Sequence, residues 1–125
     1  MNKIYDMAFS KVYPMLIAKA EKKGRTMQEV YEVTTWLTGY DSDQINKLLE
    51  SETTYGDFFL NAPNLNPFRK NITGKICGVR IEEIEESLLR EIRYLDKLVD
   101  ELAKGKSMLK ILVERELKTG ITFRE

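Results

Sequence analysis

The segment 61–80 holds the residues of this sequence that could most readily do chemistry. It contains no acidic residue and four cations: Arg69, Lys70, Lys75 and Arg80. Asparagines and glycines lie around these cations in the sequence. Guanidinium groups and exposed backbone amides can hold anions such as phosphate. The segment therefore predicts a ligand-binding anion site at these four cations. The alternative is that asparagine, proline and glycine serve turns here, while the cations pair with the acidic blocks on either side.

The sequence has one cysteine, Cys77, and no histidine. The lack of histidine excludes zinc sites of the Cys/His type, histidine-based triads and a Cys-His nucleophile. The nearby cations Lys75 and Arg80 could activate the thiol, but a free cysteine usually packs as a small hydrophobic side chain. We therefore expect Cys77 to be buried and structural, and we expect no catalytic residue, no metal and no cofactor. A single cysteine also excludes an internal disulfide. The lack of disulfides is typical of proteins of the reducing cytoplasm.

Four carboxylates stand close together where the second half of the chain begins. These carboxylates are Glu82, Glu83, Glu85 and Glu86. They could act as acids and bases or hold a metal if they were buried and faced one another. Acidic residues in the first turn of a helix are more simply solvated groups that favour the helix dipole. We favour this second interpretation.

The expected short helices at 26–38 and 41–51 have the length of a helix-turn-helix. A DNA-reading helix needs lysine or arginine to meet phosphates and base edges. Here the second helix and its flanks carry four acidic residues against Lys47 alone. The charges oppose DNA, so nucleic acid is the least favoured partner.

Helix signals divide the first half of the chain into short elements. Pro14 suits the first position of a helix, so we expect a turn or two over 7–13 and then a helix from Pro14 to Lys23, ended by Gly24. Three later residues are of types that favour the start of a helix: Thr26, Asp41 and Thr54. Thr26 and Asp41 each also have a capping-box partner three residues further on. Trp36 lies outside the apolar stripe of its helix, and we favour packing under the next helix over a role as a ligand platform.

The second half contains the strongest helix pattern. Apolar residues recur at spacings of four and three across 88–102, which predicts a long helix capped by Ser87 and running through Lys104. Ser107 then caps a last helix, Met108 to Lys118, that is apolar on most sides. Such a helix is either central in the bundle or covered by a partner.

The link between the two halves is the least regular part of the sequence. Residues 61–71 form a turn-rich loop with two prolines and four asparagines. The alternation over 72–81, with glycines at 74 and 78, fits either a strand pair or an irregular buried link, and we favour the irregular link.

Charge is balanced overall but arranged in blocks. The net charge is +4 over 1–25, −6 over 26–60, +4 over 61–80, −5 over 81–101 and +3 over 102–125. Such alternation fits a domain whose blocks pair with each other or with a partner. The apolar runs are too short to span a membrane, and the N-terminus lacks the apolar core of a signal peptide.

Several stretches of the sequence resemble one bacterial family. They are Lys19–Arg25, Trp36–Tyr40, Asn61–Pro67, Ile72–Arg80 and Ile92–Gly105. Over about residues 1–113 the chain resembles the bacterial domain-of-unknown-function family number 2200. The resemblance implies a small, mainly helical cytoplasmic protein, and it brings no activity, cofactor or catalytic residue. Family members tend to have Asp-Pro where this chain has Glu86-Ser87, so a helix from Ile81 either breaks at Ser87 or runs straight through.

These observations predict a mainly α fold: a small orthogonal bundle of about five to six helices, with a central link that is irregular or short-stranded. We expect one domain over 1–120 and a short tail over 121–125. The favoured function is a non-enzymatic helical interaction module that pairs with an unknown protein partner or with itself as a weak homodimer. The first alternative is a binder of, or enzyme for, a small anionic ligand or nucleotide at 61–80. The second is a nucleic-acid binder that uses a degenerate helix-turn-helix.

Overall fold

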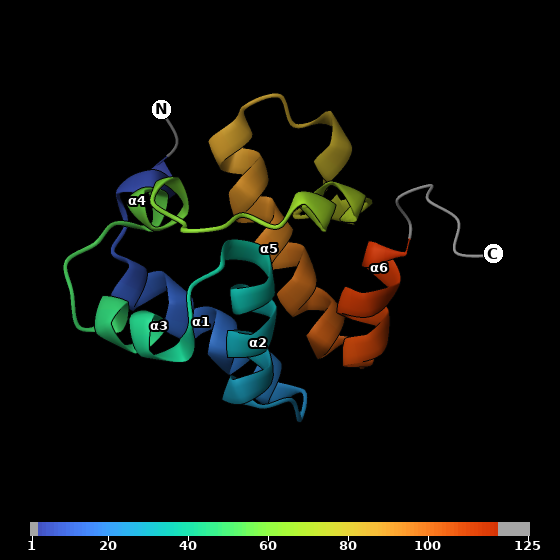
Figure 1. The fold of residues 1–125 in the computed structure, drawn as a ribbon, viewed down its shortest axis with the longest axis horizontal. Helices are drawn as coiled ribbons and strands as arrows, with labels where there is room; N and C mark the ends of the chain where they lie inside the picture. The colour runs from blue at the N-terminus through green and yellow to red at the C-terminus, as the bar shows by residue number, and fades with distance from the viewer. Residues whose placement is uncertain (1–2, 118–125) are drawn as a thin grey trace.

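The computed structural model describes residues 3–117, in which short helices surround one long helix (Figure 1). The α-helices are α1 (Phe9–Lys22), α2 (Met27–Thr38), α3 (Ser42–Leu49), α4 (Tyr55–Leu60), α5 (Ser87–Ala103) and α6 (Glu114–Glu116). The short elements are the 3₁₀ turns η1 (Lys3–Asp6), η2 (Pro67–Asn71) and η3 (Ile81–Glu83), the π-helical turn η4 (Leu109–Val113), and the strands β1 (Lys75–Ile76) and β2 (Val79–Arg80). Helices take up more than half of residues 3–117, which confirms the mainly α fold. None of them is long and apolar enough to cross a membrane. The predicted tail, 121–125, lies outside the described residues.

Helix α5 is the spine of the fold, as its apolar spacing predicts. It is the longest helix of the described part at 17 residues, and α1 and α2 both pack along it. The core-facing side chains of α5 are fully buried: Ile92, Leu95, Leu98, Val99 and Leu102.

The predicted cap of α5 is wrong. Ser87 is the first residue of the helix, and Glu86 before it makes no side-chain cap. Instead, the buried side chains of Ile81 and Ile84 anchor the chain ahead of the helix. The chain therefore breaks between η3 and α5 rather than running straight through.

Helix α1 is one continuous helix, so the predicted break at Pro14 is also wrong. Pro14 lies inside α1, exposed to solvent. Contacts with other segments stabilise the helical turn before Pro14. The backbone N–H of Phe9 donates to the carbonyl of Thr53, and the side chains of Phe9 and Tyr13 are fully buried in the core. Tertiary packing thus holds the helical geometry on the N-terminal side of the proline, although proline removes one backbone donor.

The predicted starts of α2, α3 and α4 are confirmed. Thr26 forms a full capping box with Glu29, and Asp41 forms one with Gln44. Thr54 accepts a hydrogen bond from the backbone of the third residue of α4. These caps satisfy backbone N–H groups that have no partner inside the helix, which fixes where each helix begins.

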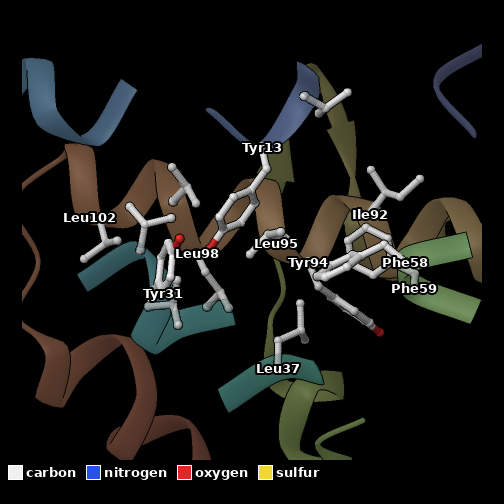
Figure 2. Packing of buried hydrophobic residues seen from close by; sticks show 14 of the residues in the cluster. Tyr13, Tyr31, Leu37, Phe58, Phe59, Ile92, Tyr94, Leu95, Leu98 and Leu102 are labelled. Atoms are coloured by element: carbon white, nitrogen blue, oxygen red, sulfur yellow. The ribbon is translucent and has the colours of Figure 1, made fainter. Parts of the chain in front are cut away.

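Aromatic side chains fill the end of the core where α1 meets α4 (Figure 2). Phe9 stacks between Tyr13 and Phe58, with ring centroids 4.8 and 4.3 Å apart. Tyr40 also stacks on Phe58, with ring centroids 4.7 Å apart, and Phe59 meets Phe58 edge-on. Ring contacts of this kind add to the stabilisation that burial alone provides.

The link over 72–81 contains a short strand pair, so the favoured irregular link is wrong. Strands β1 and β2 pair antiparallel, with Lys75 opposite Arg80 and Ile76 opposite Val79. Cys77 and Gly78 form the turn, both with positive φ, 54° and 78°. This turn points Cys77 into solvent, so the predicted burial of Cys77 is wrong. Two residues at positive φ are what a tight two-residue hairpin requires.

Candidate functional site

The last helix, made of η4 and α6, is fastened to the spine by a buried ion pair. The guanidinium of Arg115 donates two hydrogen bonds of 2.7 Å to the carboxylate of Glu101, and both residues are buried. Asn71 of η2 adds a hydrogen bond to the carbonyl of Arg115. Burial alone would raise the pKa of Glu101, but the hydrogen bonds and charge of Arg115 outweigh it and lower that pKa. The pair therefore stays ionised and holds the last helix in one position.

The last helix presents one apolar face to the core and another to solvent. Ile111 and Leu112 are buried, whereas Leu109, Val113 and Leu117 are 58%, 45% and 55% exposed. Residues four apart lie on one side of a helix, so Leu109 and Val113 share one side. Leu117, the C-cap residue directly after α6, keeps helical backbone angles and continues this stripe. We call these three side chains the outer face. The start of the helix agrees with prediction, since the hydroxyl of Ser107 accepts a hydrogen bond from the backbone of Lys110. The predicted end, Lys118, lies outside the described residues.

Two opposite charges lie beside the outer face. Lys110 and Glu114 follow Leu109 and Val113 directly in the sequence, and both are exposed. Neither forms an ion pair within residues 3–117. The flank of the outer face thus carries a positive charge towards its start and a negative charge towards its end.

A hollow of about 430 Å³ lies between the last helix and helices α2 and α3. Its lining comes mainly from α2, with one residue from α3 and one from η4: Gln28, Tyr31, Glu32, Thr35, Trp36, Ser42 and Leu112. We call it the Trp36 hollow. Trp36 packs against the core and also lines the hollow. Its packing under the next helix stays a prediction.

Hydrogen bonds fix both aromatic walls of the Trp36 hollow. The indole N–H of Trp36 donates to Oε2 of Glu116 at 2.8 Å, and the hydroxyl of Tyr31 donates to Oδ1 of Asn46 at 2.6 Å. The lining includes the carboxylate of Glu32 and no lysine or arginine. Glu116 adds a second carboxylate beside the indole. The hollow therefore combines fixed aromatic walls with negative charge.

The four cations of segment 61–80 lie in two pairs, one on η2 and one on the strand pair β1 and β2. Arg69 donates to both carboxylate oxygens of Glu91 on α5, at 2.9 and 3.1 Å, and Arg80 lies 3.4 Å from Glu82. Lys75 is the cross-strand partner of Arg80, and Lys70 is exposed on η2 beside Arg69. The anion site stays a prediction. Phosphate that raises the melting temperature more than chloride of equal ionic strength would support it.

The four carboxylates at 82–86 precede α5, and two of them, Glu82 and Glu83, lie in the first turn of η3. All four are exposed. Glu82 braces the hairpin, since its Oε1 accepts a hydrogen bond of 3.0 Å from the backbone N–H of Gly74. Within residues 3–117 no group of three histidine, cysteine or acidic side chains is placed to share a metal ion.

The fold and this site define a small, mainly helical domain with an exposed helix face beside an open hollow. Residues 3–113 match the family described as "Uncharacterized protein conserved in bacteria (DUF2200)", and the chain belongs to that family. It is also similar to the crystal structure of uncharacterized protein SP1917, with 54% sequence identity and a TM-score of 0.89. That match covers 93% of this chain and 96% of the other. No curated protein matches the chain.

Proposed function

We propose that this protein is a non-enzymatic, cytoplasmic interaction module that pairs with a second copy of itself through the outer face of its last helix. The single observation that carries the proposal is the exposed stripe Leu109, Val113 and Leu117 on a helix that Arg115 and Glu101 hold in place. A free, unpaired Cys77 on the surface fits the reducing cytoplasm.

The charges beside the outer face support a second copy as the occupant. When two identical helices pack antiparallel, the flank with Lys110 and Glu114 meets the same flank of the other copy in reversed direction. Lys110 of each copy then lies opposite Glu114 of the other. In a parallel arrangement this flank would instead face the opposite flank of the other copy, so Lys110 and Glu114 would not meet across the contact. Opposite charges across an interface favour the correct partner and its orientation.

The expected dimer is weak because the outer face is small. Stable interfaces bury about 1,200–2,000 Å² in total, and three side chains on a short helix supply only part of such an area. The module should therefore be monomeric when dilute and dimeric when concentrated.

Sedimentation equilibrium over a wide range of protein concentration tests the proposal. We expect the average mass to rise towards that of two chains, and we expect Leu109→Glu to weaken association by about tenfold or more, since it places a carboxylate in an apolar contact. Met15→Glu is the matched control: Met15 is also 58% exposed but lies on α1. The proposal fails if the chain stays monomeric throughout, or if both variants weaken association equally.

A further inference from the structure

We propose that the Trp36 hollow binds a guanidinium group. Its volume of about 430 Å³ falls within the range of small-molecule sites, roughly 300–1,000 Å³. This inference stands apart from the proposed pairing, because it concerns the hollow between the last helix and α2 rather than the outer face.

The walls of the hollow suit a flat cation. A guanidinium stacks on an aromatic face, and tryptophan offers the strongest attraction to a cation. Trp36 and Tyr31 supply two aromatic side chains, and their hydrogen bonds to Glu116 and Asn46 fix them before any ligand arrives. Such preorganisation reduces the entropy that binding would otherwise cost.

The charge of the hollow selects a cation over an anion. Glu32 is exposed and forms no ion pair within residues 3–117. The Oε2 atom of Glu116 already accepts the hydrogen bond from the indole N–H of Trp36. The surrounding block, 26–60, has a net charge of −6. A guanidinium could stack on the indole and donate to the carboxylate of Glu32, with the hydroxyls of Thr35 and Ser42 and the amide oxygen of Gln28 as further acceptors.

Trp36 is also the means of measurement, because it is the only tryptophan in the sequence. Its fluorescence therefore reports on the surroundings of a single residue, which lines the hollow. The probes are butylguanidinium and its neutral isostere butylurea, and separately the blocked tripeptide acetyl-Gly-Arg-Gly-amide and its citrulline counterpart. The small probe and the peptide distinguish a free metabolite-like ligand from the arginine side chain of a protein partner.

We expect at least one guanidinium probe to change the fluorescence saturably, and we expect its neutral counterpart to leave it unchanged. Glu32→Gln should weaken binding about two- to fivefold, the range of an exposed ion pair. Glu50→Gln should not weaken it, because Glu50 is exposed at the end of α3 and does not line the hollow. Added salt should weaken binding as well.

Two results would overturn the inference: no saturable change with either guanidinium probe, or equal binding of the charged and neutral members of a pair. Both titrations use dilute protein, at which the proposed dimer is dissociated. A failure here therefore leaves the self-association untouched, and a failure of self-association leaves this inference untouched.

Discussion

Two fully buried tyrosines differ in what their hydroxyl groups contact. Tyr13 and Tyr55 are both 0% exposed. The hydroxyl of Tyr13 lies 2.7 Å from that of Thr34, whereas the hydroxyl of Tyr55 has no hydrogen-bond partner within residues 3–117. Burial raises the pKa of Tyr55 well above its ordinary value, and the charge of Asp96 adds to this. Tyr55 is therefore neutral at any ordinary pH, and its buried hydroxyl makes no hydrogen bond within residues 3–117.

Replacing these two tyrosines with phenylalanine should have opposite effects on stability. Tyr55→Phe removes a buried hydroxyl without a partner, so we expect the free energy of unfolding to rise by about 1 kcal/mol. Tyr13→Phe removes a hydrogen bond, so we expect it to fall by about 1 kcal/mol. Urea unfolding measures both changes. A similar loss in the two variants would mean that the hydroxyl of Tyr55 is satisfied after all.

Glu29 should make the protein sensitive to acid. Hydrogen bonds from Arg25, and then from the backbone of Thr26, lower the pKa of Glu29 from 4.5 to about 2. Between these values the unfolded chain binds a proton at Glu29 and the folded chain does not. The stability that Glu29 contributes is therefore complete above pH 4.5 and is lost as the pH falls towards 2.

The matching measurement is thermal unfolding as a function of pH. We expect the melting temperature of the wild type to fall more steeply below pH 4.5 than that of Glu29→Gln. Glu50→Gln serves as the control, because that carboxylate forms no ion pair within the described part of the chain. Parallel curves for wild type and Glu29→Gln would contradict the assignment.

At the scale of elements, the buried ion pair decides where the last helix lies. Arg115→Ala would leave the carboxylate of Glu101 buried, with Lys106 at 3.7 Å and Lys97 as the cations that still act on it. Breaking a buried pair by removing one partner typically costs about 3–5 kcal/mol. We expect such a loss in urea unfolding, together with a change in the fluorescence of Trp36, because Glu116 would leave the indole.

A matched variant separates this effect from the loss of any arginine. Arg80→Ala removes a half-exposed arginine whose nearest carboxylate, on Glu82, is also largely exposed. We expect that change to cost less than about 1 kcal/mol. Equal losses in the two variants would show that the last helix does not depend on its ion pair.

Elements governed by short-range signals could be predicted from the sequence. The capping boxes at Thr26 and Asp41 and the apolar spacing of α5 lie within a few residues of the elements that they specify, and the structure confirms them. The prediction at Pro14 was wrong because a distant contact, Thr53 with Phe9, holds the first turn of α1 and overrides the local preference. The prediction at Ser87 was wrong because the buried side chains of Ile81 and Ile84 anchor the chain before α5, and no side chain caps that helix.

At the scale of the whole molecule, the candidate site could be predicted only in part. The exposed face of the last helix follows from its surplus of apolar residues. The Trp36 hollow does not, because Trp36 and Glu116 are 80 residues apart and only the fold brings them together. Likewise, the partners of Arg69 and Arg80 on the acidic segment that follows could be named as an alternative but not assigned.

Reversing the two charges beside the outer face tests whether two copies pair antiparallel through that face. Lys110→Glu alone, or Glu114→Lys alone, places like charges opposite each other across an antiparallel contact. The double variant exchanges both charges and restores opposite pairs. The measurement is the dimer dissociation constant by sedimentation equilibrium at low salt. We predict that each single variant weakens association by up to about tenfold and that the double variant returns it to the wild-type value. A double variant at least as weak as either single variant, or a wild-type chain that stays monomeric at every concentration, would contradict the account.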